Sequence, residues 1–105
     1  MSDITELHQA LLERILGKDG AAPLELRRAA YRNAGLDEPI KTLIDKVALR
    51  SYGVADADVD TARVVGLSED QIFEIVVCAA VGQATRQYTS ALEALAGATE
   101  DRGTQ

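Results

Sequence analysis

The feature that most constrains the fold of this chain is a junction between two helical patterns at Gly66. Before this glycine, apolar residues recur at helical spacing behind Asp56, which is a favourable N-cap residue. After it, Ser68 and Gln71 have the spacing of a capping box that opens a second helix. Glycine suits the left-handed conformation in which many helices end. The junction therefore predicts two consecutive helices, at about residues 57–65 and 69–96.

The second of these helices is predicted to be the centre of the fold. Its segment 72–81 is apolar on almost every face, so we expect it to be buried all round by other helices. Cys78 lies in this segment and is expected to act as a small hydrophobic residue. A bend is expected near Gly82. Gln83 is expected at a helix–helix or subunit contact, and the alternative is the polar wall of a pocket.

Three further helices are predicted upstream from apolar periodicity and helix-end signals. They are expected to begin at a capping box of Asp3 and Glu6, at Pro23 and at Asp37. Glycines are expected to end them, at Gly17, Gly35 and Gly53. The basic residues of the second helix, Arg27, Arg28 and Arg32, are expected to face water. No stretch alternates with the period of a strand, so the prediction is an all-α bundle of about five helices. Residues 1–97 are expected to form one domain and residues 98–105 a disordered polar tail.

Charge and composition exclude several classes of partner. The 105 residues carry 17 acidic and 11 basic side chains, a net charge of −6. Such an acidic balance argues against nucleic acid and against anionic membranes. The sequence lacks an apolar run long enough to span a membrane and an N-terminal secretion signal, so a cytoplasmic location is expected.

No metal or cofactor is predicted from the ligand-type residues. Asp56, Asp58 and Asp60 have the spacing that opens a calcium loop. Thr61 and Leu67 then stand where that loop needs glycine and glutamate. The aspartates are therefore expected to favour a helix start through the helix dipole. His8 is the single histidine, and a surface or helix-packing role is expected for it.

The region from about residue 40 to 81 resembles the AhpD-like superfamily, which includes alkylhydroperoxidase D proteins and carboxymuconolactone decarboxylases. The matching residues are Ala62, Gly66, Leu67, Ser68 and Ile72, followed by an apolar helix. The resemblance implies an all-α helical unit that assembles as dimers, trimers or hexamers. A homo-oligomer is also expected because a chain of this size has few helices with which to cover so apolar a segment.

The catalytic motif of the redox members, Cys-x-x-Cys-x-x-x-His, is absent. Its three positions fall on Ser51, Val54 and Asp58. Without a cysteine pair there is no dithiol–disulfide cycle, so peroxidase activity is not implied. The resemblance then leaves two hypotheses: a non-redox protein that acts by assembly or by binding a protein or small molecule, and an enzyme with a remodelled pocket. In the second, candidate residues are Ser51, Tyr52, Asp56 and Asp58, with Asp58 as the base.

Overall fold

The computed structural model describes residues 2–50 and 53–103, and within these ranges every regular element is an α-helix. In chain order the helices are α1 (Ser2–Ile15), α2 (Leu24–Arg32), α3 (Ile40–Leu49), α4 (Asp56–Val64) and α5 (Glu69–Gly103). The all-α prediction with five helices is confirmed over the described residues. The molecule measures 59 × 28 × 21 Å, because α5 alone spans about 52 Å.

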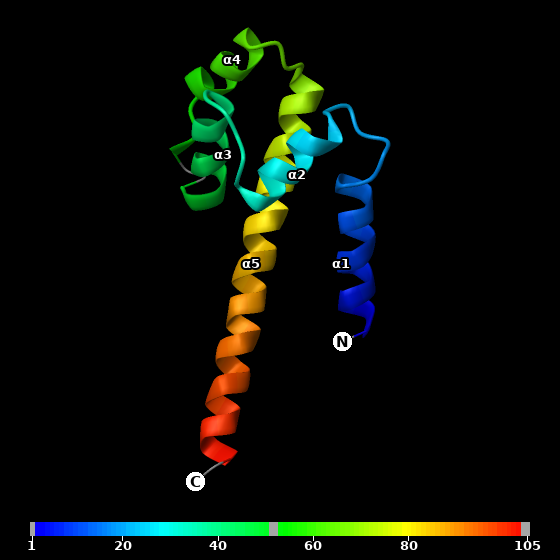
Figure 1. The fold of residues 1–105 in the computed structure, drawn as a ribbon, viewed down its shortest axis with the longest axis vertical. Helices are drawn as coiled ribbons and strands as arrows, with labels where there is room; N and C mark the ends of the chain where they lie inside the picture. The colour runs from blue at the N-terminus through cyan, green and yellow to red at the C-terminus, as the bar shows by residue number, and fades with distance from the viewer. Residues whose placement is uncertain (1, 51–52, 104–105) are drawn as a thin grey trace.

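The core surrounds the first half of α5 (Figure 1). Helix α2 crosses α5, α3 and α4 lie on one side of it, and α1 lies on the other. The largest fully buried side chains are Leu43, Ile44, Ile75 and Cys78. The prediction that segment 72–81 is buried all round is wrong, because Phe73 and Ala80 of this segment are exposed.

The junction between α4 and α5 forms as predicted. Gly66 has a φ of 104°, a backbone conformation that residues with a Cβ rarely adopt. Ser68 Oγ accepts a hydrogen bond from the Gln71 N–H, and Gln71 Oε1 accepts one from the Ser68 N–H, at 3.1 and 2.9 Å. These two bonds satisfy N–H groups that the first turn of α5 cannot pair internally.

The carboxylates that cap α3 and α4 differ from those predicted. Helix α3 begins at Ile40, and Glu38, not Asp37, accepts a hydrogen bond from the Thr42 N–H at 2.8 Å. Asp58, not Asp56, accepts one from the N–H of Ala55, the residue that precedes α4, at 2.9 Å. In both places a carboxylate reaches a backbone N–H near a helix start, which the helix dipole favours.

The observed ends of α2 and α3 also differ from the predicted ones. Helix α2 ends at Arg32, and the next residue, Asn33, takes the left-handed conformation with a φ of 52°, two residues before the predicted end at Gly35. Asparagine tolerates this conformation better than most residues with a side chain. Helix α3 ends at Leu49, earlier than the predicted break at Gly53, and residues 51–52 lie outside the described part.

Helix α5 continues without interruption through Gly82, where a bend was expected. A Cβ atom at this position would collide with the carbonyl oxygen of Tyr31 in α2. That oxygen accepts a hydrogen bond of 2.6 Å from Nη1 of Arg86. Gly82 therefore marks a place where the backbones of α2 and α5 approach each other closely.

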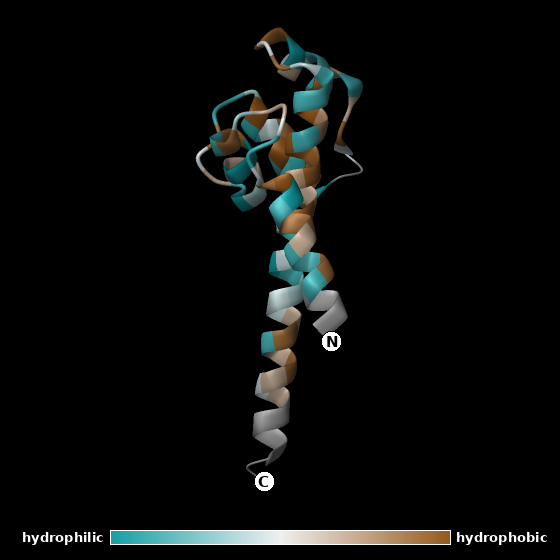
Figure 2. Cartoon of the chain, turned by 90° about the vertical axis from the view of Figure 1, so that its right-hand side faces the viewer, coloured by the Kyte–Doolittle hydropathy of each residue, from teal (hydrophilic) through white to brown (hydrophobic). Residues whose placement is uncertain are grey.

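The C-terminal part of α5 extends well past the other helices. It is helical to Gly103, beyond the end predicted at residue 96 and into the segment expected as a polar tail. Hydrophobic colour continues along α5 beyond the level at which the other helices surround it (Figure 2). Among the described helices, none is both long and apolar enough to cross a membrane.

Candidate functional site

The structure describes two of the four residues that were candidates for a remodelled catalytic pocket. Ser51 and Tyr52 lie outside the described residues. Asp56 is exposed at the first turn of α4. Asp58 accepts hydrogen bonds from the Ala55 N–H and from Lys46 Nζ, the latter at 3.0 and 2.9 Å.

These contacts make Asp58 a poor general base. The hydrogen bond from the Ala55 backbone, with a further contribution from Lys46, holds the pKa of the Asp58 carboxyl below its ordinary value. A carboxylate with a lowered pKa binds a proton weakly. Its position instead joins α4 to α3 through Lys46 and fixes the start of α4.

The remaining acidic residues near α4 are engaged in ion pairs. Asp60 Oδ1 lies 3.6 Å from Arg63 Nη1, and Arg63 also pairs with Glu69 at the start of α5. Within the described side chains, no three His, Cys, Asp or Glu residues are grouped so that they could hold a metal ion.

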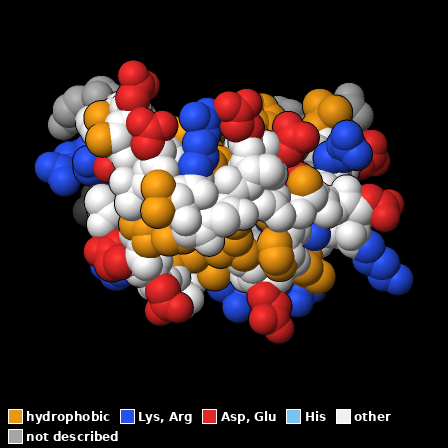
Figure 3. All heavy atoms as spheres, turned by 90° about the horizontal axis from the view of Figure 1, so that it is seen from above, with side chains coloured by type: hydrophobic (Ala, Val, Ile, Leu, Met, Phe, Trp, Pro, Cys, Tyr) orange, Lys and Arg blue, Asp and Glu red, His pale blue; other side chains and the backbone are white. Residues whose placement is uncertain are grey.

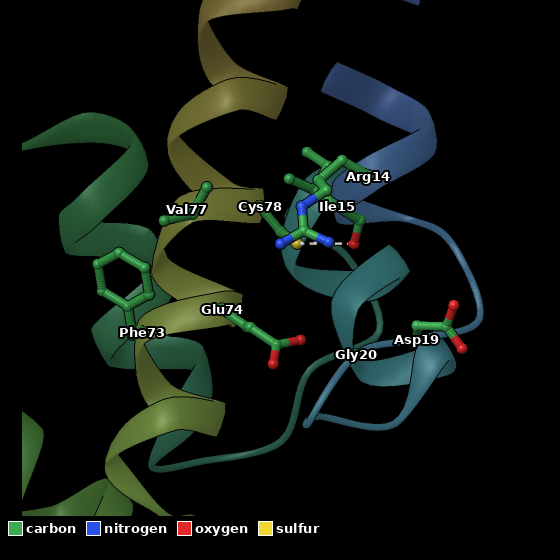
Figure 4. Close-up of a pocket in the computed structure, with 8 residues that line it drawn as sticks. All are labelled: Arg14, Ile15, Asp19, Gly20, Phe73, Glu74, Val77 and Cys78. Atoms are coloured by element: carbon green, nitrogen blue, oxygen red, sulfur yellow. Dashed lines mark hydrogen bonds between the residues drawn. The ribbon is translucent and has the colours of Figure 1, made fainter. Parts of the chain in front are cut away.

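His8 and Cys78 both connect α1 to α5. His8 Nε2 lies 3.0 Å from Thr85 Oγ1, which confirms the helix-packing role. Cys78 is buried, and its Sγ lies 3.6 Å from the carbonyl oxygen of Ile15 (Figure 4). Burial raises the pKa of the Cys78 thiol, so the reactive thiolate is disfavoured.

Arg27 is buried, so the expectation that it faces water is wrong. Its side chain is only 2% exposed and donates hydrogen bonds to the carbonyl oxygens of Ala22, Ile15 and Gly17 at 2.9, 3.0 and 2.6 Å. Its Nε also lies 3.7 Å from Glu74 of α5. Sequence periodicity gave no sign of this, because Arg27 finds its partners in the loop after α1.

Glu74 completes this cluster by holding the same loop against α5. Its Oε2 accepts a hydrogen bond from the Ala21 N–H at 2.6 Å. A cavity of about 220 Å³ lies beside it (Figure 4). Glu74 and Cys78 point toward α1 and the loop, whereas Phe73 and Val77 project from the other side of α5. The polar side chains of this cluster are occupied in fastening the loop.

The most distinctive surface is a line of apolar residues along α5, which we call the open face. Its members are all exposed or partly exposed: Phe73, Val77, Ala80, Ala84, Tyr88, Ala91 and Leu95. At 3.6 residues per turn they fall within about 80° of arc and extend over about 33 Å. Phe73 is 69%, Tyr88 51% and Leu95 64% exposed. An apolar surface this long and this exposed is typical of an interaction site.

Charged side chains avoid the open face. Between residues 73 and 98 the charged residues of α5 are Glu74, Arg86 and Glu93, and none belongs to the open face. Glu74 and Arg86 are bound to the loop after α1 and to α2. A surface helix that served only to meet water would carry charges on this side as well.

A hollow between α3, α4 and α5, which we call the α3–α5 groove, borders the open face. Its volume is about 630 Å³, and Ala80 and Ala84 belong to both surfaces. Most of its lining is aliphatic, including Leu43 and Val47 of α3. Gln83 also lines it and accepts a hydrogen bond from Arg86 Nη2 at 3.0 Å. Gln83 thus lies in a groove wall, which was the alternative prediction, and its hydrogen bond is to a residue of the same helix. The expected helix–helix or subunit contact of Gln83 stays a prediction.

Comparison with known proteins adds no relative: no family model, no curated protein and no solved structure matches this chain. Function must therefore be argued from these surfaces.

Proposed function

We propose that this protein acts through self-assembly, as a non-redox helical subunit whose open face binds a second copy of the chain. The observation that carries this proposal is the exposed apolar line along α5, from Phe73 to Leu95. Burying such surface is the main driving force of protein association. The AhpD-like scaffold remains part of the proposal, and the helix–Gly66–Ser68–helix junction supports it.

The isolated second half of α5 also favours assembly. Residues 87–98 are all exposed, so this half of the helix buries little of its surface within its own chain. Helices of this length are only marginally stable in water unless an amphipathic face packs against something. A partner on the open face would supply that packing and thereby stabilise the helix.

The alternative of an enzyme with a remodelled pocket has less support. Asp58, its proposed base, is ionised and held by Ala55 and Lys46, and Asp56 lies exposed. Cys78, the single thiol, is buried with a raised pKa. A binding role for the assembled protein fits these observations better than catalysis.

Light scattering after gel filtration tests the proposal. The chain has a mass of 11.2 kDa, and at micromolar concentration we expect a multiple of this value. Tyr88→Glu should weaken assembly by more than about tenfold, because each interface would then bury two new carboxylates. Thr89→Glu is the matched control, since it adds the same charge one residue away and outside the open face, where the side chain is exposed. A mass of 11.2 kDa that does not change with concentration would contradict self-assembly.

A further inference from the structure

The spacing of the open face is symmetric about Ala84. Phe73 and Leu95 lie eleven residues from Ala84 on either side, Val77 and Ala91 lie seven, and Ala80 and Tyr88 lie four. A two-fold axis through Ala84 would therefore superimpose the line of side chains on itself when a second α5 runs antiparallel. Interfaces of symmetric dimers need this self-complementarity, because when residue i of one copy contacts residue j of the other, residue j of the first copy also contacts residue i of the second.

The sizes of the paired residues are complementary as well. Tyr88 would face Ala80 of the second copy, Val77 would face Ala91, and at the axis Ala84 would face itself. Alternation of large and small side chains allows two surfaces to interdigitate, and alanine at the crossing point keeps the helix axes within the usual separation of about 8–10 Å. None of the paired positions carries a charge, so no like charges oppose each other.

We propose that two copies pair antiparallel through their open faces, with the two-fold axis at Ala84, and that Tyr88 of each enters the α3–α5 groove of the other. This inference rests on the proposed self-assembly and specifies its geometry. Ala80, the residue opposite Tyr88, lies in the groove wall, and its small side chain leaves the adjoining space open. Gln83 and Gln87 line the same groove and offer amide groups near which a tyrosine hydroxyl can find a hydrogen-bond partner.

The surroundings of the groove agree with this occupant. Seen from the α4 end, many hydrophobic side chains lie together in the lower centre of the view, others lie along its upper edge, and acidic and basic side chains stand around the rim (Figure 3). A second copy brings an uncharged aromatic residue to an aliphatic groove. A charged peptide would find no ionic partner on the open face.

Disulfide trapping tests the register. Across a close crossing, facing Cα atoms lie about 5 Å apart, within the range that a disulfide bridges. With Cys78 buried, Ala84→Cys should form a covalent dimer under mild oxidation, and Thr89→Cys, on the same helix but off the open face, should not. A mixture of Val77→Cys and Ala91→Cys proteins should cross-link to each other, and neither protein should cross-link when it is alone.

The groove is tested separately by Ala80→Leu, which occupies the space proposed for Tyr88. We expect this variant to weaken dimerisation by more than about tenfold. Ala96→Leu, an equal enlargement at an exposed site outside the open face, should leave dimerisation unchanged.

The results separate this inference from the proposed function. A protein that is monomeric by light scattering would overturn both. A dimer whose Ala84→Cys variant does not cross-link, or whose Thr89→Cys variant cross-links equally well, would overturn the register and leave self-assembly standing. If the Ala80→Leu variant dimerises normally, the proposal that Tyr88 occupies the groove is contradicted. Binding of a small apolar molecule in the groove would then be the better interpretation.

Discussion

At the scale of single residues, Arg27 illustrates how a charged side chain serves as a structural centre. Its guanidinium donates hydrogen bonds to the carbonyl of Ile15 at the end of α1 and to those of Gly17 and Ala22 in the following loop, and Glu74 lies beside it to balance the charge. Buried charges of this kind persist only when they are paired and hydrogen-bonded.

Replacing Arg27 by Met should destabilise the protein by about 3 kcal/mol, because three carbonyls lose their donor and Glu74 loses its counter-charge. Urea unfolding followed by circular dichroism would measure the loss. Arg28→Met is the control: Arg28 is exposed on the same helix, and we expect a change within about 0.5 kcal/mol. Equal effects of the two substitutions would show that the Arg27 hydrogen bonds contribute no stability.

Asp58 should make the stability depend on pH. Its pKa in the folded protein is lowered, chiefly by the Ala55 N–H, so its ionised form stabilises the fold above the ordinary aspartate pKa. This contribution should disappear as the pH falls through the lowered folded-state pKa. We therefore expect Asp58→Asn to be less stable than the parent at pH 7, with a difference that shrinks below about pH 4.

Urea titrations at several pH values would show whether the two stability curves converge in acid. Asp56→Asn, at an exposed carboxylate of the same helix end, should stay close to the parent throughout. A difference between Asp58→Asn and its parent that persists at low pH would contradict the assigned role of the carboxylate.

At the scale of the helices, the crossing of α2 and α5 decides how the core closes. Gly82 allows the two backbones to meet, and Arg86 then fastens the carbonyl of Tyr31. A glycine inside a helix costs about 1 kcal/mol relative to alanine, so its place here is explained by the close approach and not by helix propensity.

Two glycine substitutions in α5 should therefore act in opposite directions. Gly82→Ala should destabilise the protein by about 1–3 kcal/mol, since its methyl group meets the Tyr31 carbonyl and α2 must shift. Gly97→Ala adds the same methyl group where no atom lies within 4 Å and should stabilise the helix by up to about 1 kcal/mol. Thermal unfolding of both variants provides the measurement. Stabilisation by Gly82→Ala would refute the close packing of α2 on α5.

At the scale of the whole molecule, the elongated shape follows from the length of α5. The other four helices surround only its first half, and its second half extends beyond them. Self-assembly through the open face should link stability to protein concentration. We expect the midpoint of thermal unfolding to rise as the concentration increases from about 1 to 100 μM, because association favours the folded state by mass action. Tyr88→Glu should remove this dependence, whereas Thr89→Glu should retain it. A midpoint that is independent of concentration in the parent protein would count against assembly.

The sequence by itself determined the helical class, the order of the five helices and the α4–α5 junction. These features depend on local signals: a glycine that accepts a positive φ, a Ser–Gln pair three residues apart, and apolar periodicity. The burial of Cys78 could also be predicted, because its neighbours along the chain are apolar.

Only the tertiary structure decided which polar residues are buried and which side of α5 stays open. Arg27 is buried because the loop after α1 folds back over it, and Gly82 is needed because α2 crosses at that turn. The sequence predicted that segment 72–81 of α5 is apolar on nearly every face, yet the number of faces covered depends on how many helices the chain can place around it. Helices α1 to α4 contact only part of α5, so the apolar line from Phe73 to Leu95 stays exposed within one chain, and the physical reason is that the described chain places too few helices around so long a helix.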